Sequence, residues 1–96
     1  MVTAIVLLNV ERNGVEGVAQ QLLSFEGVTE VFSVAGQYDL VAILRTHTNE
    51  EIADLMTSSI RNVPHILRTE TLMAFKAYSR DDLGAMFSIG NEESTT

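Results

Sequence analysis

The sequence predicts an α+β fold of the ferredoxin-like class, in the order β-α-β-β-α-β, with a four-stranded antiparallel sheet and two helices on one face. Two segments carry apolar residues at the three-and-four spacing of an amphipathic helix. Four other segments are apolar or alternating and rich in β-branched residues, which is typical of strands. At 96 residues the chain has the length of one domain.

The first half of the chain is predicted to form a strand, a helix and a β-hairpin. Residues 2–10 are almost continuously apolar and too short for a typical helix, so they are expected to form the first strand. Residues 28–35 and 40–46 are expected to form two strands joined by a turn that begins at Gly36. The helix between them shows its apolar face at Val15, Val18, Ala19, Leu22 and Leu23.

The second half is predicted to form a helix and a long strand. Thr48 followed three residues later by Glu51 is a capping box, and the residues up to Pro64 are expected to form one helix. Its apolar face comprises Ile52, Leu55, Met56 and Ile60. Residues 66–78 alternate as a strand, with Thr69, Thr71, Met73 and Phe75 on one face and Arg68, Glu70, Leu72, Ala74 and Lys76 on the other.

The predicted domain covers residues 1–79, and residues 80–96 are expected to add only a short helical turn over 82–87 and a disordered polar tail over 91–96. The first strand is apolar on both faces, with Ile5 and Leu7 opposite to Ala4, Val6 and Leu8. Two helices can cover only one face of the sheet, so we expect a homodimer that buries the second face, sheet against sheet.

The composition excludes several classes of function. The chain has 13 acidic residues against 6 Lys plus Arg, a formal charge of −7, and its basic residues are scattered, so direct binding to nucleic acid is not expected. No run approaches eighteen apolar residues and no secretory leader is recognisable, so a cytoplasmic protein without membrane contact is expected. There is no cysteine, and His47 and His65 have no carboxylate at ligand spacing, so neither a metal site nor a cofactor is predicted.

The segment Gly36-Gln37-Tyr38-Asp39-Leu40 is the candidate binding site. A glycine at a strand junction allows positive φ and leaves its amide open to a ligand, and the Asp39 carboxylate can bind a small cationic group. The alternative is an ordinary hairpin in which Asp39 hydrogen-bonds its own turn and Tyr38 covers the hairpin.

Two motifs give the chain a family resemblance. The 36–40 turn fits a Gly-x-aromatic-Asp pattern after the second strand, and Pro64-His65-Ile66 followed by Thr69-Glu70-Thr71 fits a Pro-Gly-Val then Thr-x-Thr pattern at the fourth. With this spacing, residues 2–79 resemble the effector-binding domain of the Lrp/AsnC regulators, often called the RAM domain. His65 stands where the family has glycine, and no helix-turn-helix precedes the first strand, so the resemblance is to a stand-alone effector module.

The resemblance implies dimers formed through the sheets, rings of dimers that are commonly octameric, and amino acids bound in clefts between dimers. It implies a ligand site made by Gly36, Gln37, Tyr38, Asp39 and Leu40, with Thr69 and Thr71 from the fourth strand. A role of the two threonines in cross-strand packing alone is the alternative. The implied partners are further copies of the chain, an amino acid or related metabolite, and full-length Lrp/AsnC regulators.

These observations predict a non-enzymatic sensing module that responds to an amino acid through assembly or partner contact. Two alternatives remain open. One is a small dimeric enzyme of oxygenase or isomerase type, for which His65, Tyr38 and Asp39 are the available groups. The other is a ligand-free adaptor that assembles with full-length regulators through the sheet surface.

Overall fold

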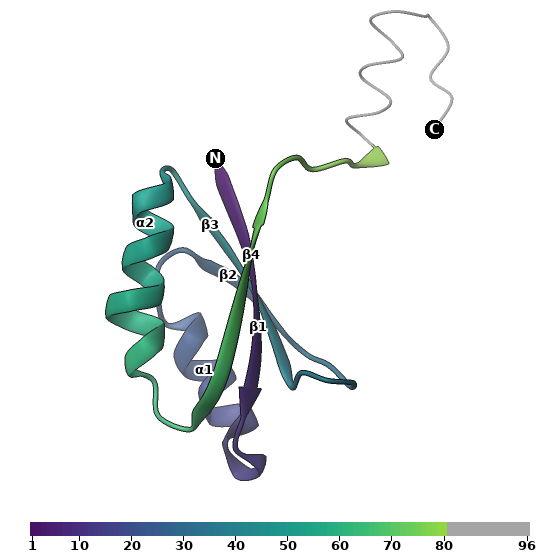
Figure 1. Ribbon diagram of the computed structural model, residues 1–96, viewed down its shortest axis with the longest axis vertical. Helices are drawn as coiled ribbons and strands as arrows, with labels where there is room; N and C mark the ends of the chain where they lie inside the picture. The colour runs from purple at the N-terminus through teal and green to yellow at the C-terminus, as the bar shows by residue number, and fades with distance from the viewer. Residues whose placement is uncertain (81–96) are drawn as a thin grey trace, which may run out of the picture.

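The computed structural model describes residues 1–80 and shows the predicted architecture, with one antiparallel sheet and both helices on the same side of it (Figure 1). The order of strands across the sheet is β2-β3-β1-β4, so β1 and β3 are central and β2 and β4 are the edges. The elements are β1 Val2–Val10, α1 Val15–Leu23, β2 Val28–Ser33, β3 Leu40–Thr46, α2 Asn49–Asp54 and β4 Ile66–Ala74.

The core lies between the sheet and the two helices. From Ala4 to Val10, β1 alternates between buried residues at even positions and half-buried residues at odd positions. The even residues face the helices, where Leu22 of α1 and Ile60 are fully buried. Burial of each such aliphatic side chain stabilises the fold by roughly 1.5–3 kcal/mol. The sheet contributes Ala4, Val6, Leu8, Val10, Val28, Leu40, Ala42 and Leu44 to this core.

The second helical segment begins as predicted but does not continue as a regular α-helix. Thr48 accepts a hydrogen bond from the Glu51 N–H at 3.2 Å, and Glu51 Oε1 accepts one from the Thr48 N–H at 2.9 Å, which confirms the capping box. The predicted extent is confirmed, because helical turns continue to Asn62, but the turns change type: a π-helical turn covers Leu55–Ser59 and a 3₁₀ turn covers Ile60–Asn62. In an α-helix, residues eight apart lie about 80° apart around the axis. The wider π turn reduces this angle and lets Ile52 and Ile60 enter the same core.

The capping box makes stability depend on pH. Hydrogen bonds from the backbone N–H groups of Thr48 and His47 lower the pKa of Glu51 from its ordinary value of 4.5. A carboxyl group whose pKa is lowered by folding contributes stability above its unfolded pKa and loses it as pH falls through the folded pKa. We expect the parent to be more stable than Glu51→Gln at about pH 6 and to lose this advantage progressively as the pH falls below about 4.5. Urea unfolding of both proteins at a series of pH values measures this difference in stability. A difference that stays constant with pH would contradict the expectation.

Two strands are shorter than predicted, and both differences follow from pairing. β4 ends at Ala74 rather than at residue 78. Ala74 pairs with Thr3, and because β1 begins at Val2 it offers almost no further residues with which β4 could pair. Phe75, directly after the strand, has a fully exposed side chain. β2 ends at Ser33 rather than at residue 35; the Val34 N–H makes one further bond across the hairpin, to the Asp39 carbonyl, before the chain turns at Gly36, which has positive φ. The helical turn predicted over 82–87 and the tail over 91–96 lie outside the described residues.

The face of the sheet away from the helices is apolar, as the sequence predicted. Phe32 and Leu72 are 49% and 45% exposed on this face, which we call the open face. The register places them beside half-buried aliphatic residues, since Phe32 pairs with Val41 and Leu72 pairs with Ile5. The apolar residues of the open face are Ile5, Leu7, Phe32, Val41, Ile43 and Leu72. Burial of this face in a homodimer stays a prediction.

Candidate functional site

The predicted binding turn is tied to the end of β1 by backbone hydrogen bonds. Gly36 has φ of +138°, a conformation that favours glycine, which confirms the reason for a glycine at this point. The Asp39 N–H donates to the Leu8 carbonyl at 2.9 Å, and the Val34 N–H donates to the Asp39 carbonyl at 3.0 Å. The turn therefore has a fixed position at the lower end of the sheet (Figure 1).

The Asp39 carboxylate bonds β1 rather than its own turn. Its Oδ2 accepts from the backbone N–H of Val10 at 3.0 Å and is 3.5 Å from the Asn9 amide nitrogen. The same amide nitrogen donates to the Gln37 carbonyl at 2.8 Å. The pairing of β1 with β4 shifts register between Asn9 and Val10, so the carboxylate supplies an acceptor where the ladder is irregular. Asp39 thus has a structural role in the single chain, whatever ligand it contacts.

Tyr38 extends the turn across the open face to the edge strand β4. Its phenol O–H donates to the carboxylate of Glu70, and the guanidinium of Arg68 lies 5.9 Å from its ring centroid. Because the bond to Glu70 favours the protonated phenol, the pKa of Tyr38 is raised from its ordinary value. Sequence reasoning missed Arg68 and Glu70 as neighbours of this turn, although their alternation with Thr69 and Thr71 already placed them together on one face.

The two threonines lie on the other side of the sheet from Tyr38. Thr69 pairs with Leu8 and Thr71 with Val6, so both side chains face the helices. Thr69 lines a pocket of about 420 Å³ beside residues 56–61, and Thr71 lines one of about 650 Å³ beside α2. No residue of the 36–40 turn lines either pocket, so one protomer does not bring the two halves of the predicted site into one cavity. Leu40, predicted as an apolar wall, is 1% exposed and belongs to the core.

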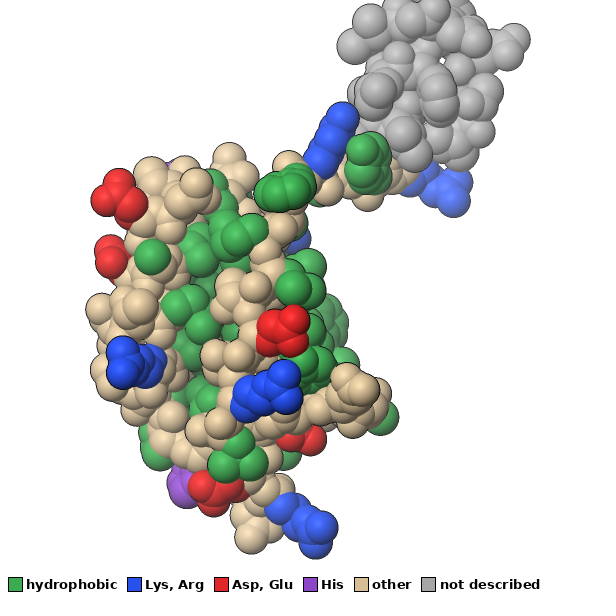
Figure 2. Space-filling model, in the orientation of Figure 1, with side chains coloured by type: hydrophobic (Ala, Val, Ile, Leu, Met, Phe, Trp, Pro, Cys, Tyr) green, Lys and Arg blue, Asp and Glu red, His purple; other side chains and the backbone are tan. Residues whose placement is uncertain are grey.

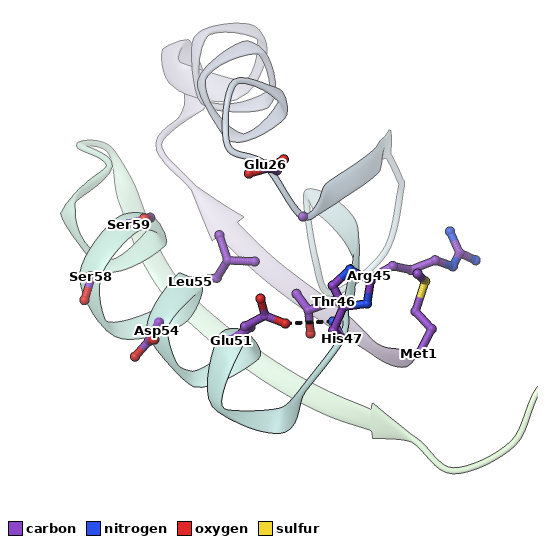
Figure 3. A pocket seen from close by; sticks show the side chains of 11 residues that line it. Met1, Glu26, Arg45, Thr46, His47, Glu51, Asp54, Leu55, Ser58 and Ser59 are labelled. Carbon is purple, nitrogen blue, oxygen red and sulfur yellow. Dashed lines mark hydrogen bonds between the residues drawn. The ribbon is translucent and has the colours of Figure 1, made fainter.

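A further pocket, of about 420 Å³, was not predicted from the sequence (Figure 3). It lies between the end of β3 and the second helical segment, and its lining includes Glu26, Arg45, His47 and Asp54. The dashed contact in Figure 3 joins Glu51 to His47, whose backbone N–H donates to Glu51 Oε1 at 2.8 Å. The Glu51 carboxylate of this pocket is therefore already engaged in capping the helix. No residue of the 36–40 turn lines the pocket.

The part of the chain that the structure describes contains no group of three or more potential metal-ligating side chains of the His, Cys, Asp or Glu type. In the same residues no helix has the length and apolar character needed to cross a membrane.

Comparison with known proteins gives consistent results. The family model described as the Lrp/AsnC ligand binding domain matches residues 3–83. The crystal structure of TTHA0845 from Thermus thermophilus is 42% identical, with a TM-score of 0.77 over 82% of this chain and 99% of that chain. The HTH-type transcriptional regulator FL11 of Pyrococcus abyssi is 29% identical over 75 residues, which are 78% of this chain and 49% of that protein. The chain spans about half the length of the curated relatives it matches.

A more distant structure adds support for the fold. The feast or famine regulatory protein Rv3291c from M. tuberculosis, solved in complex with L-methionine, has a TM-score of 0.69 over 82% of this chain and 53% of that chain. At 21% identity this likeness shows the shared ferredoxin-like fold. The bound methionine is a property of that protein.

Proposed function

The chain belongs to the Lrp/AsnC ligand-binding domain family, and from this we propose that it is a sensing module that binds an amino acid at a boundary between protomers. The match over residues 3–83 carries the proposal, because it includes both the 36–40 turn and the Thr69-Glu70-Thr71 strand. The regulators among its relatives support a role in transcription regulation rather than in catalysis. A cytoplasmic location fits this role.

The chemistry of the turn suits a zwitterion. An amino acid needs an anionic group for its ammonium, N–H or O–H donors for its carboxylate, and a wall for its side chain. The Asp39 carboxylate is partly exposed and has further acceptor capacity beyond the Val10 N–H. Gly36 and Gln37 are exposed and offer the donors, while Tyr38 offers an aromatic surface.

The separation of the turn from Thr69 and Thr71 supports a site that two protomers complete. The turn of one copy and the helix side of β4 of another would form its two halves, because one chain holds them on opposite sides of its sheet. The open face supplies the apolar surface for a homodimer, since a patch of this kind is rarely left exposed in monomers. Further association of dimers, as in an octameric ring, would bring the halves together.

The proposed response is a linkage between ligand and assembly. A ligand that contacts two protomers binds only the assembled form, so it raises the population of that form and its melting temperature. Full-length Lrp/AsnC regulators are the proposed partners, because they carry the same domain and could join mixed assemblies.

The test is a panel of the twenty amino acids, read by thermal melting and by sedimentation velocity. We expect at least one amino acid to raise the melting temperature and the sedimentation coefficient of the parent together. Asp39→Asn keeps an oxygen for the Val10 N–H but removes the charge, so it should keep the fold and lose most of the ligand response. Glu16→Gln removes an exposed carboxylate from α1, far from the turn, so it is the matched control and should respond like the parent.

If no amino acid moves either measurement, sensing is wrong and a ligand-free adaptor is the better explanation. If Asp39→Asn responds like the parent, the carboxylate does not bind the ammonium group. Turnover of a bound metabolite by the parent would instead favour the enzyme alternative.

A further inference from the structure

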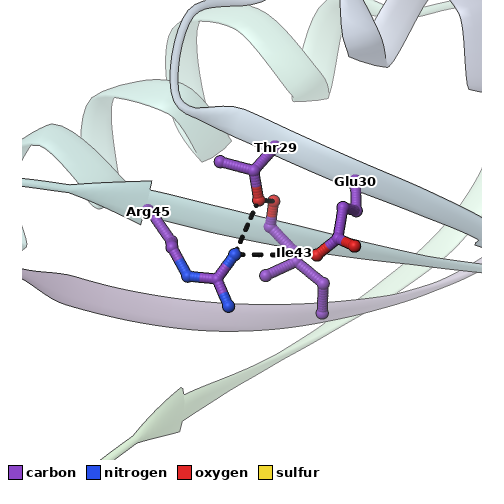
Figure 4. Close-up of polar contacts among 4 residues, drawn as sticks. All are labelled: Thr29, Glu30, Ile43 and Arg45. Atoms are coloured by element: carbon purple, nitrogen blue, oxygen red, sulfur yellow. Dashed lines mark hydrogen bonds and ion pairs between the residues drawn. The ribbon is translucent and has the colours of Figure 1, made fainter.

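The two edge strands of the sheet differ in how they are protected. β2 has six residues and its pairing with β3 shifts register between Val28 and Glu30. At this irregularity Arg45 donates a hydrogen bond to the Thr29 hydroxyl at 3.1 Å and lies 3.6 Å from the Glu30 carboxylate (Figure 4). The Thr29 hydroxyl in turn donates to the Ile43 carbonyl. Short length, a bulge and charges are the features by which sheets block further pairing at an edge. β2 is therefore a protected edge.

β4 is less protected than β2, because its register shift with β1 lies at its start, between Ile66 and Arg68, and its two charges, on Arg68 and Glu70, are of opposite sign. It has nine residues, pairs regularly with β1 from Arg68 to Ala74, and contains no proline or lysine. Among residues 1–80 no strand pairs with its outer side. A long regular edge of this kind is a template for another strand.

A hydrogen bond between β1 and the turn before β3 identifies which backbone N–H and C=O groups of β4 point away from the sheet. The Leu8 carbonyl accepts from the Asp39 N–H, so the polar backbone groups of Leu8 point toward β3. Leu8 pairs with Thr69, which must therefore be a pair without mutual backbone bonds. The N–H and C=O of Thr69 consequently point away from the sheet, and those of Thr71 do the same because strand residues alternate.

The sequence of β4 is complementary to itself around Thr69. In an antiparallel pair of two β4 strands centred there, Arg68 of each copy stands opposite the partner's Glu70, and Thr69 stands opposite the partner's Thr69. Opposite charges and paired threonines both stabilise cross-strand neighbours. We propose that β4 pairs in this register with β4 of a second copy about a two-fold axis at Thr69, joining two sheets edge to edge.

Other symmetric registers fit the charges less well. A two-fold axis at Thr71 would place Glu70 opposite the partner's Leu72 and leave Arg68 opposite the partner's Ala74, so neither charge would face an opposite charge. The axis at Thr69 pairs both charges of each strand. Tyr38 holds Glu70 and Arg68 together from the β1 side, so the two charges are already in place before a second copy arrives.

The groove beside β4 supports the same register. Hydrophobic side chains gather between α2 and β4 (Figure 2), and this groove is lined by Ile52, Met56, Thr71 and Met73. Leu67 has 65% of its surface exposed in the single chain. In the proposed register it stands opposite the partner's Thr71, so its side chain would enter the partner's groove.

A charge-swap series tests the pairing without any ligand. Arg68→Glu places like charges opposite at two positions of the interface, and Glu70→Arg does the same, so each should weaken association roughly tenfold in sedimentation equilibrium. Arg68→Glu/Glu70→Arg restores opposite charges and should return the association constant to within about threefold of the parent. Tyr38→Phe removes the phenol bond that holds Glu70 in place but changes no charge, so it should weaken association less than either charge reversal does.

Cross-linking tests the position of the axis. The chain has no cysteine, so Thr69→Cys introduces a single thiol, and opposed residues of an antiparallel pair lie about 5.5 Å apart between Cα atoms. A short thiol-specific cross-linker should give a dimer band on a denaturing gel. Ser33→Cys, exposed on the protected edge strand β2, should stay a monomer.

The proposal is overturned if the single reversals associate like the parent, if the double swap fails to recover, or if Thr69→Cys does not cross-link. If β4 paired with another segment, or in a different register, the single reversals would associate like the parent or Thr69→Cys would not cross-link. The pairing is independent of ligand sensing, so an amino-acid panel without effect would leave it intact.

Discussion

Gly14→Ala is expected to lower the free energy of unfolding by about 1–3 kcal/mol, the cost of forcing extra volume into a packed site. A Cβ atom at Gly14 would lie 2.9 Å from the Cβ of His65, closer than real Cβ contacts come. Both atoms are attached directly to the backbone, so the crowding cannot be relieved by rotating a side chain. The segments that must move apart are joined by the bond from the Glu11 N–H to the His65 carbonyl at 2.9 Å. Urea unfolding measures the loss.

His65 provides the rescue for this variant. Its φ of +75° lies in the left-handed region, where a side chain costs about 1–2 kcal/mol and glycine costs little. In a His65→Gly background the crowding atom is absent, so Gly14→Ala should lower the free energy of unfolding by less than about 1 kcal/mol. The difference between its cost in the two backgrounds is the coupling energy that a double-mutant cycle measures. Gly17→Ala, in α1 with open space around it, should stabilise the chain by roughly 0.5–1 kcal/mol. Equal costs of Gly14→Ala in both backgrounds would show that His65 is not the obstacle.

Asp39→Ala is expected to lower the free energy of unfolding by about 1–3 kcal/mol, because it leaves the N–H of Val10 without its acceptor. Val10 is buried, so water does not readily replace the carboxylate. The loss of the bond also frees the turn that carries Tyr38 toward Glu70. Thermal and urea unfolding of the parent and the variant measure the effect.

The matched variant Asp39→Asn separates the two roles of this residue. Its amide oxygen can accept from the Val10 N–H, so most of the stability should return while the negative charge is absent. A variant that is stable but insensitive to amino acids would assign the charge to the ligand. Equal stability of Asp39→Ala and the parent would contradict the structural role, and equal instability of Asp39→Asn and Asp39→Ala would show that the charge itself holds the turn.

The sequence predicted the features that depend on near neighbours. The two faces of β1, the face of α1 and the Thr48–Glu51 capping box all follow from spacings of two to four residues. The structure confirms them except at Leu23, which was predicted on the apolar face of α1 but is 49% exposed. The strand order follows from the succession of these elements. Strand ends were less predictable, because β4 stops where β1 no longer offers a partner and not where its own alternation ends.

The features that the sequence did not predict depend on distant contacts. The bond of Asp39 to Val10 and that of Tyr38 to Glu70 join residues far apart in the chain, and the first of them lies at the register shift between β1 and β4. The π turn over Leu55–Ser59 leaves no signal in the apolar spacing of residues 52–60, which fits a regular α-helix. The resemblance named Thr69 and Thr71 together with the turn, but only the structure shows that a single chain holds them on opposite sides of the sheet.

The unequal edges of the sheet limit how large an assembly the strands alone can build. A sheet that accepted partners at both edges would polymerise without a natural end, as amyloid ribbons do. Among residues 1–80 the bulge at Thr29 and the Arg45–Glu30 ion pair protect the β2 edge, which leaves β4 as the available edge. Under the proposed β4 pairing, growth by strand addition would stop at two chains, and any larger assembly would have to use the faces of the sheets.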